Sequence, residues 1–185
     1  MYALRMKKIL ITGASGMLGR NLTDKLSDLF DVLALSKDKE LPLSLDITNK
    51  DAVHNIFKSF KPDIVVNCAA FTNVDKAEVE KSLARDINVK GLENIIKSLP
   101  LKSKIIHIST DYVFDGQSSD YKEDDMKSPV NYYGKTKLES ENVLIGSNCN
   151  YLIIRPNVLY SGDNTPFSTS LDSFKPAQHF LSWLV

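Results

Sequence analysis

Short apolar runs alternate with longer amphipathic segments along this chain of 185 residues. The runs are rich in Ile, Val and Leu, as buried strands are, whereas the longer segments repeat apolar residues every three or four positions, as helices do. The predicted strands cover residues 8–12, 31–35, 63–70, 104–109 and 151–155. The predicted helices cover residues 18–29, 51–60, 78–99 and 131–144. The pattern therefore predicts an α/β fold.

Strands this apolar are typical of a parallel sheet that helices cover on both faces. We expect a Rossmann-type, doubly wound parallel sheet, in which ligands bind at the carboxyl ends of the strands. The apolar face of its first helix is expected to consist of Leu18, Leu22, Leu26 and Leu29.

Residues 1–160 carry the whole of this pattern, and we expect them to form one domain. The tail, residues 161–185, is different. It is rich in Ser, Asp, Thr, Pro and Phe without a clear period up to residue 176, and residues 180–185 form an apolar run. Two interpretations of this tail stay open, a terminal helix that covers a sheet edge and a disordered or foreign segment.

The composition is that of an ordinary globular protein, with 43% hydrophobic residues, 25% charged residues and a formal net charge of zero. This balance predicts no broad surface for nucleic acid or membrane. Residues 1–5 are too short and polar for a signal peptide, and no apolar run approaches the ~20 residues of a membrane span. Cys68 and Cys149 show neither metal spacing nor disulfide density, which suits a reducing cytosol. We therefore expect a cytoplasmic protein.

The histidines do not predict a metal site. His54 and His179 have no carboxylate or cysteine partner at metal spacing. His107 falls within a predicted strand and is expected in the core or along the wall of a site.

A glycine-rich turn, with the pattern G-x-x-G-x-x-G, joins the first predicted strand to the first predicted helix. Such glycines let backbone N–H groups approach a pyrophosphate at the helix N-terminus, and let the helix pack closely on the sheet. Many strand-to-helix turns carry glycine merely for backbone geometry, so this signal is weak without its context. The residues predicted to bind a dinucleotide cofactor here are Gly13, Ser15, Gly16, Met17, Leu18 and Gly19.

The end of the second predicted strand bears on the choice of cofactor. An acidic residue there would bind the ribose 2′-hydroxyl of NAD and repel the 2′-phosphate of NADP. Ser36 stands near this position, and the nearby Lys37 and Lys39 could meet a phosphate, so the sequence favours NADPH. The alternative is that both lysines only solvate the loop. Asp46 and Ile47 are placed to meet the adenine.

Hydroxyl groups follow the fourth predicted strand. A hydroxyl at the carboxyl end of a central strand can donate a hydrogen bond to a carbonyl oxygen that is becoming an alkoxide. Thr110 is our first choice for this role and Ser109 the second. The alternative is a strand end in which these side chains only satisfy loose backbone groups.

Tyr133 and Lys137 stand four residues apart on the predicted helix of residues 131–144, about 5–6 Å apart on one face. A nearby ammonium favours the phenolate and is expected to lower the pKa of the tyrosine toward neutral pH. The same lysine can bond the ribose of a nicotinamide cofactor. Tyr132 with Thr136 is the shifted alternative, but that pair lacks the cation.

With these motifs the chain resembles the extended short-chain dehydrogenase/reductase superfamily, and within it the dTDP-4-dehydrorhamnose reductases. The resemblance covers roughly residues 8–160, and its matching stretches are residues 11–16, 67–78, 87–89, 109–116 and 131–139. It implies an NAD(P)H-dependent oxidoreductase that reduces the 4-keto group of a nucleotide sugar. The implied reaction converts dTDP-4-dehydro-L-rhamnose to dTDP-L-rhamnose, a polysaccharide precursor. NADPH is the expected cofactor and NADH the alternative.

The resemblance also implies roles for single residues. Thr110 would orient the carbonyl, Tyr133 would donate the proton, and Lys137 would tune Tyr133 and hold the ribose. The residues implied to run along the cofactor are Asn67, Cys68, Ala69 and Ala70. Those implied to contact the sugar nucleotide are Thr110, Asp111, Tyr112 and Phe114.

Two departures from the family pattern stand out. The family often has a tryptophan at the position of Val158, where it packs at the substrate. Its members also continue for about 100 further residues that carry much of the substrate pocket, so this substrate-binding part is expected to be largely absent here. The tail after Gly162 is not expected to match the family.

Two other functions stay open beside the reductase. The regulatory subunit of methionine adenosyltransferase is similar to these reductases, and its Arg-x-x-x-Leu-Tyr segment resembles residues 155–160. The chain could thus be a non-catalytic NADP-binding regulatory module that acts on a partner protein. A defective product of a shortened gene is the third alternative. The sequence leaves a homodimer open and carries over no magnesium site.

Overall fold

A computed structural model describes residues 5–38, 43–157 and 159. Within these residues, five parallel strands form one sheet in the order β2-β1-β3-β4-β5. The strands are β1 (Lys8–Thr12), β2 (Asp31–Leu35), β3 (Ile64–Asn67), β4 (Lys104–Ile108) and β5 (Asn150–Ile154). The predicted parallel sheet is confirmed.

The order of the strands reverses between β1 and β3. In doubly wound sheets the ligand crevice lies at the carboxyl ends of the strands where the order reverses. An isolated parallel bridge joins Ser36 to Ser44 beyond β2. If this bridge is counted as a rudimentary strand, the sheet has the order 3-2-1-4-5-6. That order is typical of Rossmann folds, which bind dinucleotides at the point of reversal.

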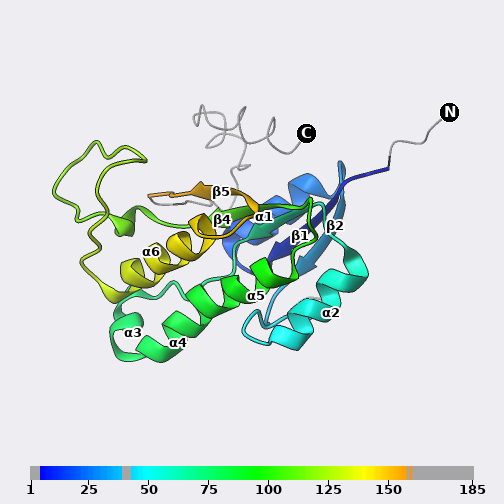
Figure 1. Cartoon of the computed structure of the whole chain (residues 1–185), viewed down its shortest axis with the longest axis horizontal. Coiled ribbons are helices and arrows are strands. Elements are labelled where there is room, and N and C mark those ends of the chain that lie inside the picture. Colours follow the sequence, from blue (N-terminus) through cyan, green and yellow to red (C-terminus); the bar gives the residue numbers. More distant parts are fainter. Residues whose placement is uncertain (1–4, 39–42, 158, 160–185) are drawn as a thin grey trace.

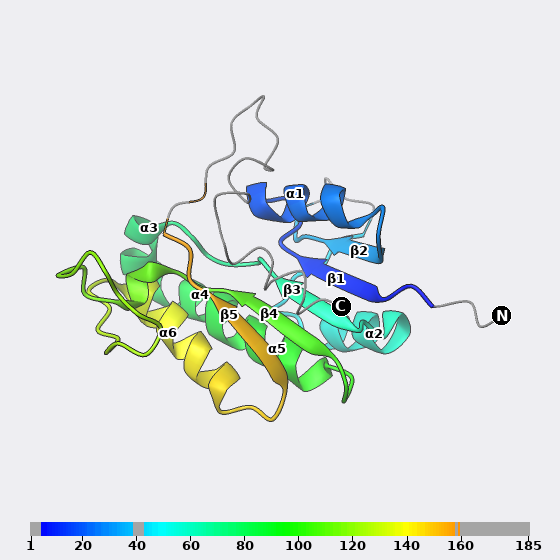
Figure 2. The ribbon, with the colours of Figure 1, turned by 90° about the horizontal axis from the view of Figure 1, so that it is seen from above.

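Helices cover the sheet on both faces (Figures 1 and 2). On one face, α1 (Met17–Leu26) packs Leu22 and Leu26 against alternate residues of β1, β3 and β4. The other face carries α2 (Lys50–Phe60), α5 (Gly91–Ser98) and α6 (Tyr132–Ile145). Because successive strand residues point to opposite faces, a continuous apolar strand such as β1 serves both layers of the core.

The predicted helix of residues 78–99 is interrupted and begins earlier. Helix α3 (Val74–Val79) starts at Asn73, whose side chain accepts a hydrogen bond from the Lys76 N–H at 2.9 Å. The backbone of Glu80 leaves the helical conformation, and α4 (Lys81–Arg85) follows. A π-helical turn (Asp86–Lys90) then joins α4 to α5.

Two other predicted elements are longer than the observed ones. The strand of residues 63–70 ends at Asn67, which is paired with Thr12, the last residue of β1. Helix α1 ends at Leu26 instead of Leu29, because the N–H groups of Leu29 and Phe30 both turn back to the Leu26 carbonyl. Leu29 is consequently 63% exposed, so its expected place on the apolar face is wrong.

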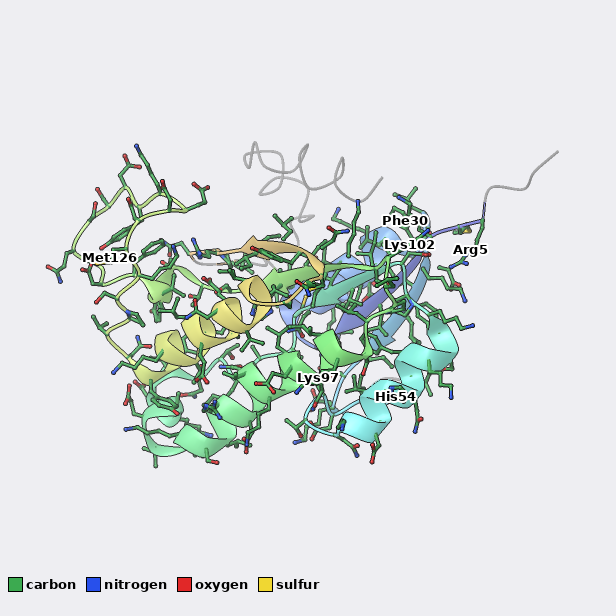
Figure 3. All side chains as sticks on the ribbon, in the orientation of Figure 1. Arg5, Phe30, His54, Lys97, Lys102 and Met126 are labelled. Atoms are coloured by element: carbon green, nitrogen blue, oxygen red, sulfur yellow. The ribbon has the colours of Figure 1, made fainter. Side chains whose placement is uncertain are left out.

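The residues labelled in Figure 3 identify the amino-terminal and carboxyl-terminal ends of the strands. Arg5, Phe30 and Lys102 precede β1, β2 and β4 and gather at one end, whereas Met126 lies at the other end, on the long loop between β4 and α6. The carboxyl ends of the strands therefore meet on the side of that loop. No helix in the described ranges is both long and apolar enough to cross a membrane. The tail lies outside the described residues.

Candidate active site

Tyr133 and Lys137 lie on α6, as predicted, and both are buried, with exposed fractions of 9% and 1%. Two side chains fix the start of this helix. The Asn131 side chain accepts a hydrogen bond from the Gly134 N–H at 2.7 Å, and Glu78 of α3 accepts one from the Tyr132 N–H at 2.6 Å. The first turn of α6, which carries Tyr133, is thus held from two sides.

Thr110 lies next to Tyr133. It follows β4 and caps a 3₁₀ turn (Asp111–Val113), accepting a hydrogen bond from the Tyr112 N–H at 3.2 Å. This turn packs so closely on α6 that a Cβ on Gly134 would overlap the Tyr112 carbonyl oxygen. The Tyr112 and Tyr133 rings meet edge to face at 6.0 Å. The structure therefore brings the three predicted catalytic residues to one end of β4.

The pKa of Tyr133 is raised, which contradicts the expectation that Lys137 lowers it. Burial is the main cause, and a hydrogen bond with the Thr110 side chain opposes it only in part. The Lys137 ammonium instead donates a hydrogen bond to the Ile108 carbonyl oxygen, at 2.7 Å. A phenol with a raised pKa is fully protonated at neutral pH and keeps a proton to donate.

Burial lowers the pKa of Lys137 from 10.5 to about 8, against the opposing effects of Glu141 and Cys68. Below pH 8 this lysine is charged in both the folded and the unfolded chain, and the buried charge destabilises the fold. Between pH 8 and 10.5 the unfolded chain keeps the proton that the folded chain releases. The contribution of Lys137 to the free energy of unfolding therefore becomes more favourable as the pH rises.

Replacement of Lys137 by Met is expected to raise the free energy of unfolding at pH 7 by about 2 kcal/mol, after allowance for the lost hydrogen bond to Ile108. Urea unfolding of both chains at several pH values measures this difference. The advantage of the variant should shrink as the pH rises from 8 to 10.5. A difference that stays constant over this range would show that Lys137 carries no buried charge.

The glycine turn lies at the crevice beside β3. Gly13 has a φ angle of +66°, and a Cβ there would lie 2.6 Å from the Ala69 nitrogen. This close approach brings the turn against the backbone of Cys68 and Ala69, within the stretch that the resemblance placed along a cofactor.

The N-terminus of α1 fits an anion. No side chain caps it, and its first turn has no acidic residue. By contrast, Asn49, Asn73 and Asn131 cap α2, α3 and α6 through side-chain hydrogen bonds. The first N–H groups of a helix need an acceptor, and a phosphate group satisfies them well. Gly16, Met17, Leu18 and Gly19 are therefore suited to hold the pyrophosphate of a dinucleotide.

The end of β2 differs from the sequence-based expectation. Ser15 Oγ lies 2.6 Å from Ser36 Oγ and donates a hydrogen bond to the Asp38 carboxylate at 2.7 Å. Lys37 turns away and pairs with Asp46 at 2.9 Å. The carboxylate of Asp38, a residue to which the sequence analysis gave no role, is thus hydrogen-bonded to the glycine turn. Lys39 lies outside the described residues.

Asp46 and Ile47 are engaged by the protein itself. The Asp46 carboxylate accepts hydrogen bonds from the Thr48 N–H and hydroxyl at 2.9 and 2.7 Å. Although burial opposes it, these bonds and Lys37 hold the pKa of Asp46 below its usual range. The Ile47 side chain is 4% exposed and packs into the core against Gly91. The structure therefore leaves their contact with adenine a prediction.

Asn88 is a site residue that the sequence reasoning noted only as part of a matching stretch. Its side chain accepts a hydrogen bond from the Phe71 N–H at 2.7 Å and donates to the Phe71 carbonyl at 3.2 Å. It also donates to the Thr136 hydroxyl at 2.9 Å. Asn88 thus ties the segment after β3 to α6, the helix that carries Tyr133 and Lys137.

The residues implied to contact a sugar nucleotide differ in exposure. Tyr112 is 44% exposed beside Tyr133, and Asp111 is half-buried. Phe114 is 7% exposed and is stacked on Tyr121, with the Arg155 guanidinium 5.6 Å from its ring centre. Phe114 therefore packs within its own loop. Val158 lies outside the described residues.

Two hollows in the surface of the described residues lie at different ends of the molecule. One of about 340 Å³ is next to the Lys37–Asp46 pair and is lined by Lys37, Thr48, Leu83, Asp86, Ile87 and Lys90. The other, of about 610 Å³, is at the amino-terminal end of β1, away from the predicted site. Within the described ranges, no three His, Cys, Asp or Glu residues gather closely enough to hold a metal ion.

Comparison with known proteins gives relatives of this chain. It is 46% identical over 154 residues to dTDP-4-dehydrorhamnose reductase of Aggregatibacter actinomycetemcomitans, an alignment that covers 81% of this chain and 51% of that protein. It is 34% identical to methionine adenosyltransferase 2 subunit beta of Bos taurus, over 83% of this chain and 47% of that protein. The chain thus spans about half the length of the curated relatives it matches.

A solved structure of dTDP-4-dehydrorhamnose reductase from Bacillus anthracis str. Ames, in complex with NADP, is also similar. Its TM-score is 0.78 at 34% sequence identity, and the match covers 94% of this chain and 61% of that one.

The family model described as RmlD substrate binding domain matches residues 6–180. The match thus extends beyond residue 160 into the tail. Together with the sheet order and the grouping of Thr110, Tyr133 and Lys137, this match shows that the chain belongs to the RmlD family.

Proposed function

We propose that this chain binds NADPH and reduces the 4-keto group of a dTDP-linked sugar. The observation that carries the proposal is the grouping of Thr110, Tyr133 and Lys137 at the carboxyl end of β4. The relatives named dTDP-4-dehydrorhamnose reductase support it, since they include the protein solved in complex with NADP.

The residues around the crevice fit a dinucleotide. The uncapped N-terminus of α1 would take the pyrophosphate, and Gly13 with the stretch Cys68–Ala70 would lie along the cofactor. Ser15 and Ser36 would meet the adenosine ribose, and Asp46 with Ile47 would meet the adenine. Lys137 would bond the nicotinamide ribose. When bound, NADPH supplies a hydride to a carbonyl carbon.

In this reduction the protein supplies the proton that the substrate oxygen takes up. The raised pKa of Tyr133 keeps its hydroxyl protonated at neutral pH, so that it can donate a proton to the substrate oxygen. The Thr110 hydroxyl would hold that oxygen. Lys137, on the next turn of the same helix, is charged below about pH 8 and would serve this step by holding the nicotinamide ribose.

The substrate that the relatives suggest is dTDP-4-dehydro-L-rhamnose, and the exposed Tyr112 with Asp111 would form one side of its site. The purified chain is expected to oxidise NADPH when this substrate is present, and to do so far more slowly without it. Absorbance of NADPH follows the reaction directly. Absence of both binding and oxidation would refute the proposal.

A regulatory role is the second candidate, because the chain is also similar to methionine adenosyltransferase 2 subunit beta. Tight NADPH binding without oxidation of NADPH by any keto sugar, together with a stoichiometric protein partner in a pull-down, would favour this role over the reductase.

A further inference from the structure

We propose that His107 is a positioning residue that keeps the N–H groups of Lys137 available to a bound nicotinamide cofactor. The inference rests on the proposed function, since it concerns the lysine that would hold the ribose. His107 lies on β4, is 1% exposed, and has no place in the chemistry described above.

A buried chain of hydrogen bonds crosses the sheet and ends at Lys137. The Thr12 hydroxyl donates to Asn67 Oδ1 at 2.6 Å, and Asn67 Nδ2 lies 3.1 Å from His107 Nδ1. His107 Nε2 lies 3.0 Å from Ser140 Oγ, which donates to the Lys137 carbonyl oxygen at 2.7 Å. These hydrogen bonds thus connect β1, β3 and β4 to the turn of α6 that carries Lys137.

This series of hydrogen bonds selects one tautomer of His107. Ser140 has a single hydroxyl proton and gives it to the Lys137 carbonyl, so its oxygen must accept a proton from His107 Nε2. At the other side of the ring, Asn67 uses its oxygen to accept from Thr12 and presents its N–H to His107 Nδ1. Both neighbours therefore require a neutral ring protonated at Nε2.

The tautomer matters for the ammonium of Lys137, which lies 3.4 Å from the same His107 Nε2. A protonated Nε2 has no lone pair to offer, so it cannot accept a hydrogen bond from Lys137. The opposite tautomer would accept one and would turn the ammonium toward β4. In the described part of the chain, Lys137 then has the Ile108 carbonyl, at 2.7 Å, as its one acceptor. Two of its three N–H groups are left for a ligand.

The charges around Lys137 agree with a neutral His107. Cys68, which follows β3, and Glu141 of α6 face the lysine, and Glu141 is itself paired at 2.8 Å with Arg155, the residue after β5. A protonated imidazole would add a second buried cation next to the ammonium. Burial, followed by the charge of Lys137, lowers the pKa of His107 well below its usual range.

The tautomer can be read directly from the whole protein by ¹⁵N NMR of chains labelled at histidine. The protein has three histidines, and the His107→Gln variant identifies the signal of His107. We expect a neutral ring with the proton on Nε2 between pH 6 and 8. A signal from the Nδ1-protonated tautomer, or from a charged ring, would overturn the proposal.

Binding of NADPH, followed by its fluorescence, tests the consequence. His107→Phe keeps an aromatic ring but breaks the chain of hydrogen bonds. It is expected to weaken binding about tenfold, roughly the effect of one lost hydrogen bond to a charged group. His107→Gln retains an amide that can donate to Ser140 and accept from Asn67, and should restore most of the affinity. Ile105→Val, a buried change on the same face of β4, is the matched control and should leave NADPH binding unchanged.

Equal NADPH affinity of the wild type and His107→Phe would overturn the proposal, as would equal losses in the Phe and Gln variants. Should His107→Phe fail to fold, Ser140→Ala breaks the same chain at its next member and is expected to weaken binding similarly. A wild-type chain that does not bind NADPH would instead refute the proposed function, and the NMR spectrum would still decide the role of His107.

Discussion

Replacement of Tyr133 by Phe is expected to lower the rate of NADPH-dependent reduction roughly a thousandfold, the range of a lost general acid. The variant lacks only the hydroxyl that would donate the proton. The ring stays, so its edge-to-face contact with Tyr112 and its packing against Ala77 and Ala84 are kept. The affinity for NADPH should therefore change less than threefold, a difference below about 0.7 kcal/mol. Steady-state kinetics and a fluorescence titration measure the two effects.

Tyr132→Phe is the matched control for this experiment. Tyr132 precedes Tyr133 on α6, and its ring lies beside the Lys81 ammonium at 5.4 Å, away from Thr110. This variant should keep wild-type activity. Loss of activity in Tyr132→Phe and not in Tyr133→Phe would assign the proton donor to the shifted pair and contradict our assignment.

The second large effect is expected from Glu141, a fully buried carboxylate on α6. Arg155 binds it through two hydrogen bonds of 2.8 Å each, and the Ser109 hydroxyl donates a third at 2.5 Å. Replacement of Glu141 by Ala would leave the largely buried guanidinium of Arg155 without its counter-charge. We expect the free energy of unfolding to fall by about 3–5 kcal/mol, the usual cost of breaking a buried ion pair.

Glu139→Ala provides the control, because Glu139 is two residues away on the same helix and also binds an arginine, Arg85. Both partners of that pair are about 40% exposed, so water screens the interaction and the loss of stability should be much smaller. Urea unfolding compares the two variants. A double replacement, Glu141→Leu with Arg155→Met, should recover most of the lost stability. Equal losses for Glu139→Ala and Glu141→Ala would contradict this account of the buried pair.

The fold could be predicted because the apolar pattern is unusually regular. Five short apolar runs became the five strands, with ends shifted by up to three residues. The apolar pattern could not predict where the helices within residues 74–98 begin and end. The break at Glu80 and the π-helical turn depend on contacts with distant segments, such as those of Asn88 with Phe71 and Thr136.

The catalytic grouping could be predicted from spacing, because Tyr133 and Lys137 are one helical turn apart and Thr110 follows a strand. The buried contacts around this grouping could not be predicted from spacing. Glu139 and Glu141 look equivalent in the sequence, yet only Glu141 faces β5 and meets Arg155. His107 contacts Asn67 and Ser140, residues 40 and 33 positions away, so local patterning carries no sign of the connection.

The positions of the charged side chains at the end of β2 could not be predicted from the sequence either. The sequence has two lysines beside Asp38, and these two positive charges favoured binding of the 2′-phosphate of NADPH. In the structure, Asp46 engages Lys37, whereas Ser15 orients Asp38 toward the glycine turn. Which of several neighbouring charges enters a site depends on partners that the local sequence does not contain.

The most direct test of the proposed reduction is to follow the hydride itself. The purified chain is incubated with NADPH that carries deuterium at the transferred position and with dTDP-4-dehydro-L-rhamnose, and the product is analysed by mass spectrometry and NMR. Our account predicts dTDP-L-rhamnose with one deuterium at C4 of the sugar. Binding of both compounds without any deuterated sugar would contradict it and would leave a cofactor-binding protein that does not catalyse the reduction.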